Sequence, residues 1–314
     1  RFPSTPHPPK STSEPTPNDQ ESPAAAADDD GMHYETTDRE PVRIALTSVK
    51  NLRAQVRSAM HNGLTEMLAT HTYVGLVDER RRIAAIQSGV KLYLVDYGML
   101  GHEFFYQIGL TDFGNFGVLK LDPPPKLIDL LQLAVENERT SHQPSSTQGE
   151  EEEEVYRTAP TRIAQTLIDR RDMLDEYFSL SISPDGDLLT IPLLLKGYVP
   201  SLAKLPRFLL RLGPYVDWTT EEPCFRTFLR ELAAFYTPEE LPPPPPSTGS
   251  DQDGEGERDK KEEEEEDPLK ERRVQLARML EHVLFPAIRA RMVATKSMLS
   301  GVVEVADLKG LYRV

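Results

Sequence analysis

The most reactive side chain in this sequence is its only cysteine, Cys224. It follows Pro223 at the predicted start of a helix, and a helix N-terminus can lower the pKa of a thiol enough to make it nucleophilic. Burial is the more common fate of a single cysteine, and no G-x-S-x-G elbow accompanies it. The sequence therefore favours a buried, structural Cys224. A single cysteine also excludes an internal disulfide and a multi-cysteine zinc site in this chain.

Metal and phosphate sites have no clear signature. The seven histidines are scattered, and none pairs with another at the short spacing that zinc sites use. Neither the G-x-x-x-x-G-K-[ST] loop nor the G-x-G-x-x-G loop is present. The basic cluster Arg80–Arg82 lies at a predicted hairpin turn, where contact with DNA phosphate and simple solvation are equally reasonable. These residues alone predict an α/β interaction domain with acidic linkers.

Three ranges are expected to be disordered: residues 1–40, 138–160 and 238–271. They are too polar, acidic and proline-rich to offset the entropy lost on folding. They also hold most of the acidic residues behind the net charge of −15, so the remaining chain is mildly basic. No apolar run approaches the roughly 20 residues needed to span a bilayer, and no membrane contact is expected.

Hydrophobic periodicity locates the elements of the remaining chain. Helices are expected from Thr47 to about Gly63 and over residues 103–113, 127–135, 163–178, 221–236 and 274–288. Strands are expected over residues 71–77, 82–87, 91–95, 116–121, 180–182 and 188–195. This order predicts a mixed α/β (α+β) fold in two lobes.

Two segments carry more information than their periodicity. Residues 71–121 contain LYLVDYG, FFYQI and DFGNFG, and residues 177–218 contain IPLLLKGYVP. Together with the ending ADLKGLYRV, they resemble the C-terminal domain of the shared, non-nucleolytic subunit of eukaryotic MutL heterodimers, which act in DNA mismatch repair. The resemblance covers nearly all of the predicted ordered chain. It implies a dimerisation lobe over 41–137 plus 272–314, an external α/β lobe over 161–237, and disordered acidic inserts.

The resemblance also implies where a nuclease site would lie. Endonucleolytic members carry D-Q-H-A-x-x-E-x-x-x-x-E after the third strand, and the matching stretch here starts at Asp96. Of that motif only Asp96 is retained, because the positions of the histidine and the two glutamates hold Gly98, His102 and Gln107. A hydrolytic metal site needs several converging ligands. The chain is therefore expected to be non-nucleolytic, without catalytic or metal-binding residues of its own.

Cofactors are expected elsewhere in the assembly. The family's ATPase, with ATP and magnesium, belongs to an N-terminal region, to which residues 1–40 would be the linker. Zinc is expected in the partner subunit. Members of this type usually end in Phe-Glu-Arg-Cys, whose cysteine helps complete the partner's metal site; the sequence here ends at Val314.

The expected dimer interface is the apolar helix near residue 105 with its neighbours and the C-terminus, because a small two-lobed domain could hardly bury so much aromatic surface alone. Its predicted members are Phe104, Phe105, Ile108, Leu110, Phe113, Phe116, Leu311 and Tyr312. The alternative is that they are ordinary core residues.

The resemblance further implies partners and a location. The main partner would be a MutL paralogue that carries the intact endonuclease motif, and the location would be the nucleus. Peptide motifs of a 5′ exonuclease, MutS-type complexes and a sliding clamp are further candidate partners, with DNA bound mainly through the parent protein. Two alternatives remain: a platform that mainly docks peptides, and a cryptic manganese-dependent nuclease that uses Asp96 and His102.

Overall fold

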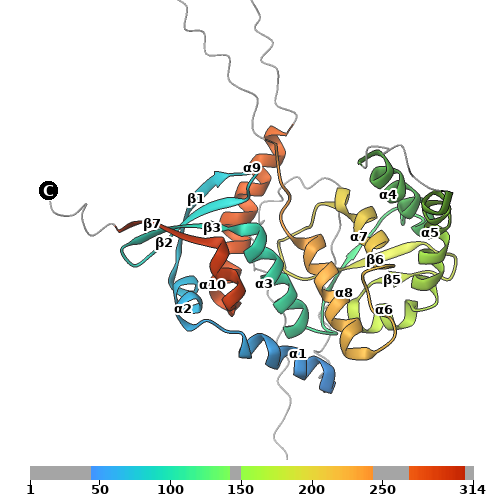
Figure 1. The fold of residues 1–314 in the computed structure, drawn as a ribbon, viewed down its shortest axis with the longest axis horizontal. Coiled ribbons are helices and arrows are strands. Elements are labelled where there is room, and N and C mark those ends of the chain that lie inside the picture. The colour runs from blue at the N-terminus through green and yellow to red at the C-terminus, as the bar shows by residue number, and fades with distance from the viewer. Residues whose placement is uncertain (1–43, 142–149, 243–268, 308–314) are drawn as a thin grey trace, which may run out of the picture. The chain divides into compact units, whose positions relative to one another are not determined.

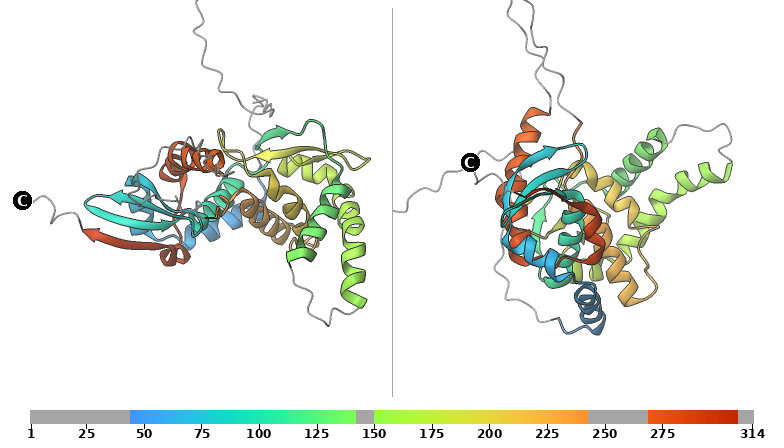
Figure 2. Two further views of the ribbon diagram at one scale, coloured as in Figure 1. Left: turned by 90° about the horizontal axis from the view of Figure 1, so that it is seen from above. Right: turned by 60° about the vertical axis from the view of Figure 1, so that its left-hand side comes forward.

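The computed structural model of the chain describes residues 44–141, 150–242 and 269–307 (Figure 1). These residues form two separate antiparallel sheets, each with its own helices. Helices α3 (Tyr97–Thr111) and α8 (Glu221–Tyr236) pack against each other between the two sheets, as Figures 1 and 2 show. The predicted mixed class is therefore confirmed.

The first sheet has four strands in the order β1-β2-β3-β7. Their bounds are β1 (Thr72–Asp78), β2 (Ile83–Ser88), β3 (Lys91–Asp96) and β7 (Val302–Asp307). The first three follow one another as predicted. Strand β7 was not predicted, and it comes from the far end of the chain to pair with β3. The C-terminal segment therefore completes the sheet that the N-terminal half begins.

Helix α1 (Thr47–Ser58) ends as expected before Gly63, but a second helix, α2 (Asn62–Thr70), follows at once. The His61 ring caps it, because its Nδ1 atom accepts a hydrogen bond from the Leu64 amide at 3.0 Å. Gly63 lies in the first turn of α2, where the lack of a side chain costs less than it would in mid-helix. Gly63 thus lies at the start of a helix, four residues after the α1 C-cap Ala59.

The predicted C-terminal helix around Pro286 is continuous but irregular. It consists of α9 (Lys270–Met279), one π-helical turn, η2 (Leu280–Leu284), and α10 (Phe285–Arg291). Proline cannot donate to the carbonyl four residues before it, and its ring crowds that carbonyl. A π turn directly before Pro286 relieves this conflict. A short 3-10 helix, η3 (Lys296–Gly301), then leads into β7.

The second sheet has three strands in the order β4-β6-β5. They are β4 (Gly117–Lys120), β5 (Ser181–Ile182) and β6 (Leu188–Leu193). Its helices are α4 (Leu127–Ser141), α5 (Glu150–Ile168), α6 (Arg171–Phe178) and α7 (Leu205–Arg211), preceded by η1 (Leu202–Lys204). Because β4 pairs with β6 and α4 packs on α5 and α7, residues 117–137 belong with the second sheet. The predicted lobe boundary at residue 137 is thus too late in the chain.

The predicted disordered ranges are also too wide. Helix α4 continues to Ser141 and α5 begins at Glu150, so ordered helix covers much of 138–160. In the range 238–271, Leu241 is buried and α9 begins at Lys270. Residues 1–43, 142–149, 243–268 and 308–314 lie outside the described structure.

Candidate functional site

The four positions of the degenerate motif run from the end of β3 into α3, and each has a structural contact. Asp96 caps α3, because its carboxylate accepts a hydrogen bond from the Met99 amide at 2.9 Å. Gly98 lies against the side chain of Arg82, which a Cβ atom at this position would overlap. Arg82 itself has a left-handed backbone and forms an ion pair of 3.2 Å with Glu240.

His102 and Gln107 lie further along α3. Burial and the nearby Arg230 guanidinium lower the pKa of His102. The Gln107 amide is buried; it donates to the Val293 carbonyl at 2.8 Å and accepts from the Val293 amide at 3.0 Å. It also donates to Glu103 at 3.1 Å. Gln107 therefore fixes the strand-like segment after α10 onto α3.

Within the described residues, no three His, Cys, Asp or Glu side chains come together in a way that could hold a metal ion. Cys224 is buried, and burial raises the pKa of its thiol to about 11. A thiol with a raised pKa is a poor nucleophile at neutral pH. Among the described residues, the side chains that we considered for catalysis or metal binding are buried or bonded to the surrounding fold.

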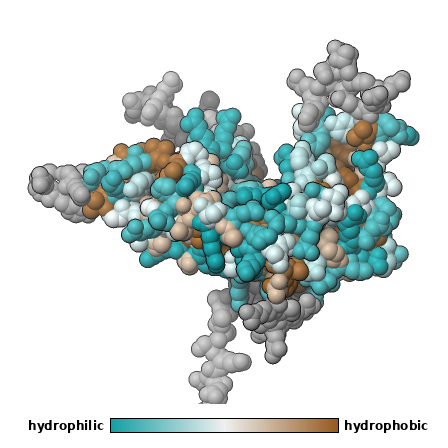
Figure 3. Space-filling model, turned by 60° about the horizontal axis from the view of Figure 1, so that its bottom comes forward, coloured by the Kyte–Doolittle hydropathy of each residue, from teal (hydrophilic) through white to brown (hydrophobic). Residues whose placement is uncertain are grey.

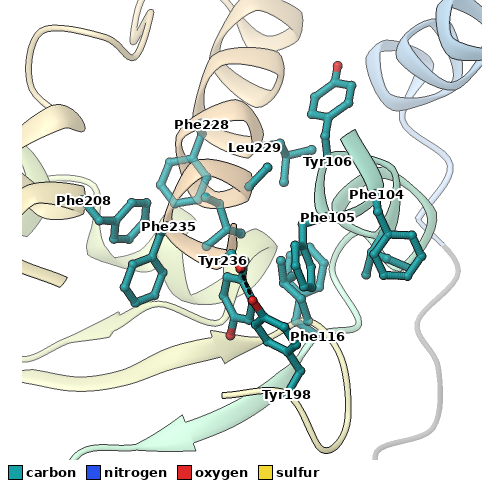
Figure 4. Packing of buried hydrophobic residues seen from close by; sticks show 14 of the residues in the cluster. Phe104, Phe105, Tyr106, Phe116, Tyr198, Phe208, Phe228, Leu229, Phe235 and Tyr236 are labelled. Carbon is teal, nitrogen blue, oxygen red and sulfur yellow. Dashed lines mark hydrogen bonds between the residues drawn. The ribbon is translucent and has the colours of Figure 1, made fainter. Parts of the chain in front are cut away.

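The six described members of the predicted interface are all buried within the chain itself: Phe104, Phe105, Ile108, Leu110, Phe113 and Phe116. Phe105 packs against both Tyr198 and Tyr236, with ring centroids 4.7 and 5.2 Å away (Figure 4). Phe113 packs on Phe225 of α8 at 4.8 Å. The structure corrects the prediction for these six residues, because other parts of the same chain already cover them. Leu311 and Tyr312 lie outside the described residues.

A different apolar surface is left uncovered. Side chains alternate along β3, so that Tyr93 and Val95 face the core while Leu92 and Leu94 point to the opposite side. The cross-strand neighbours Ile83 and Val303 share that side. None of these four packs against the buried core of the described chain. We call this surface, formed by Ile83, Leu92, Leu94 and Val303, the outer face of the first sheet.

Val303 is 56% exposed, and Figure 3 shows apolar surface gathered over this end of the molecule. Sequence analysis missed the outer face although a signal was present. Strand β3 has the sequence KLYLVD, in which the side chains that point to either face of the sheet are apolar. This pattern is typical of a strand covered on both sides.

Both edge strands of this sheet are irregular. Bulges interrupt β1 at Val74 and Val77, and another interrupts β7 at Val305. Bulges on edge strands oppose the addition of another strand at the edge. A partner is therefore more easily accommodated on the outer face than along either edge.

None of the helices described here combines the length and the apolar character needed to cross a membrane.

A family model and several curated relatives match this chain over most of its length. The family model for the DNA mismatch repair protein Mlh1 C-terminus matches residues 45–314. The DNA mismatch repair protein MLH1 of Saccharomyces cerevisiae is 38% identical over 90% of this chain and 35% of its own length. A putative MutL protein homolog 1 of Schizosaccharomyces pombe is 33% identical over 86% of this chain and 34% of its own length.

Mlh1 of Dictyostelium discoideum is 31% identical over 87% of this chain and 30% of its own length. The chain thus spans about a third of the length of the curated relatives it matches. Because the family model covers almost every described residue, the chain belongs to the family defined by the C-terminal region of the DNA mismatch repair protein Mlh1.

Proposed function

We propose that this chain is the dimerisation module of a DNA mismatch repair protein, and that it pairs with a MutL paralogue through the outer face of its first sheet. The observation that carries the proposal is the two-sided apolar character of β3. Leu92 and Leu94 lie on a sheet whose other face is already occupied by the core. Apolar surface of this kind is stabilised when a partner removes it from water, at about 25 cal/mol per Å².

The surroundings of the outer face fit a protein interface. An apolar centre with polar residues at its edge is the usual pattern, and here Gln87, the cross-strand neighbour of Leu92, places a polar side chain at the edge of the outer face. A stable pair buries about 800 Å² on each partner, so surrounding residues would contribute as well. The exposed bulge residues Val74, Val77 and Val305 are candidates.

The remaining roles concern regions and partners outside this chain, and the family resemblance is their only basis. We propose that an N-terminal region supplies ATP and magnesium binding and most of the DNA contact, that zinc is held by the partner, and that the protein acts in the nucleus. The structural contacts of Asp96, Gly98, His102 and Gln107 support a subunit without nuclease activity. MutS-type complexes, a 5′ exonuclease and a sliding clamp stay as proposed partners.

The test is light scattering after size exclusion, with this chain mixed with the C-terminal half of an endonuclease-type MutL paralogue. Wild type should form a stable one-to-one complex. Val303→Asp should weaken pairing by at least about 30-fold, since a charge at the centre of an interface costs 2 kcal/mol or more.

Val155 offers a matched control. It is also 56% exposed but lies on α5 in the second lobe. Val155→Asp should pair like wild type. Normal pairing by Val303→Asp would show that the outer face is not part of the interface. Equal loss of pairing in both variants would show a non-specific effect of the added charge. Failure of the wild-type chain to pair would contradict the dimerisation proposal itself.

A further inference from the structure

A cleft of about 490 Å³ lies between the start of β1 and the helix that runs from η2 into α10. Its floor is aromatic, but of the three rings only Tyr73 is partly exposed, because Phe285 and His71 are buried. The Phe285 ring lies 5.6 Å from that of His71 and 4.6 Å from that of Tyr73. Tyr73 faces the core side of the sheet. The cleft is thus on the opposite side of the sheet from the outer face.

The π turn accounts for the way the helix presents this floor. It places Leu284 and Phe285 next to each other in the core, so the helix is anchored by consecutive side chains. Glu281 and Arg289 remain exposed on either side of Phe285 and both line the cleft. The π turn thereby leaves a carboxylate and a guanidinium at the two ends of one aromatic floor.

These two charges are available to a ligand. Glu281 and Arg289 are eight residues apart on one helix, which is about 12 Å along its axis. No ion pair among the described residues involves either of them. Burial and Glu281 raise the pKa of Tyr73 to about 12, so its hydroxyl remains a hydrogen-bond donor in the cleft.

We propose that this cleft binds an extended segment of a partner protein in which a basic and an acidic residue, three or four positions apart, flank an apolar or aromatic side chain. An extended chain advances about 3.3 Å per residue, so three or four residues cover the axial separation of roughly 10–12 Å between the backbone positions of Glu281 and Arg289. The basic residue pairs with Glu281, the acidic residue with Arg289, and the side chain between them packs on the accessible surface of Tyr73 and Pro286.

The opposite charges of Glu281 and Arg289 favour a peptide ligand that carries both a basic and an acidic residue. An isolated anion such as phosphate would be attracted by Arg289 but repelled by Glu281. A wholly basic segment would be attracted by Glu281 but repelled by Arg289. Only a ligand with both charges pairs both ends of the cleft, while its apolar centre removes the accessible surface of Tyr73 and Pro286 from water. This role is separate from dimerisation through the outer face.

Fluorescence polarisation with a labelled, end-capped synthetic peptide tests the proposal on the full chain. The peptide contains Lys-Ala-Phe-Ala-Glu between neutral residues, and a second peptide carries lysine in place of the glutamate. Wild type should bind the first peptide more tightly. Arg289→Glu should weaken that binding about fivefold and should bind the second peptide better than wild type does.

Arg226→Glu is the matched control, because Arg226 is also exposed but lies on α8, away from the cleft. It should leave both peptides unaffected. The proposal is overturned if no peptide binds saturably up to about 1 mM, or if Arg289→Glu does not reverse the preference. It is also overturned if Arg289→Glu instead abolishes self-association, which would show a second copy of the chain in the cleft.

The two proposals fail separately. Val303→Asp should lose pairing with the paralogue and keep peptide binding, whereas Arg289→Glu should do the opposite. A variant that lost both functions would contradict the assignment of two surfaces.

Discussion

Strand β3 and helix α3 are adjacent in the sequence, and both carry more apolar surface than one neighbour can cover. Their environments differ. Phe104, Phe105 and Ile108 of α3 are enclosed by the first sheet on one side and α8 on the other. Leu92 and Leu94 of β3 have no such second layer among the described residues. The comparison shows that an excess of apolar residues identifies a segment needing two layers, but not which layer comes from another molecule.

Topology explains the difference. The chain leaves the first sheet through α3 and enters the second sheet at β4, so α3 lies between two lobes that both fold onto it. The return to the first sheet passes through α9, η2 and α10, which pack on the side of Tyr73. The outer face is left for a partner.

The largest expected effect is on stability, from a substitution in the covered helix α3. Phe105→Ala should lower the free energy of unfolding by about 3–5 kcal/mol, because it removes a fully enclosed ring and leaves a cavity. Urea denaturation followed by circular dichroism measures this. Val303→Ala, on the uncovered side, should change the isolated chain by less than about 0.5 kcal/mol. Similar losses in both variants would show that the outer face is covered in the isolated chain.

The next effect concerns the polar contact that holds α3 to the segment before η3. Gln107→Met keeps the volume but leaves the Val293 amide and carbonyl without these partners, which should cost about 2–3 kcal/mol. Gln165→Met is the control, because Gln165 is exposed and donates to the Asp169 carboxylate, directly after α5, at 2.7 Å. A loss below about 0.5 kcal/mol for Gln107→Met would remove Gln107 from the stabilising contacts.

The smallest effect is a pH dependence on the covered side of the sheet. Burial lowers the pKa of His71 below the value of 6.5 expected in the unfolded chain. The unfolded chain therefore takes up more protons as the pH falls through about 6.5, and the free energy of unfolding decreases in that direction. His102 contributes in the same sense.

Thermal or urea denaturation between about pH 7.5 and 5.5 measures this effect. His71→Gln should make the pH dependence shallower than in wild type, with His102 responsible for part of what remains. An unchanged slope would show that His71 takes up its proton without cost to the folded state.

Elements with a clear local signal were predicted well. Helix α8 was predicted with the bounds observed, and strands β1 to β3 within one residue at each end, because their periodicity is strong and their turns are short. Helices α2 and α7 and strand β7 were missed. The structure of α2 depends on the His61 cap, and that of β7 on pairing with β3, more than 200 residues earlier. A local pattern cannot report a partner so distant in sequence.

The sequence by itself determined the family, the mixed class, most strands and helices, and the loss of the ligands that the endonuclease motif requires, since each is written in residue types or short spacings. Only the tertiary structure decided which apolar surface stays exposed. Burial depends on which elements the chain folds over one another, and α8 covers the aromatic side of α3 while no described element covers Leu92, Leu94 and Val303. The same packing partly buries His102, which was considered for chemistry, and binds Gln107 to the backbone of Val293.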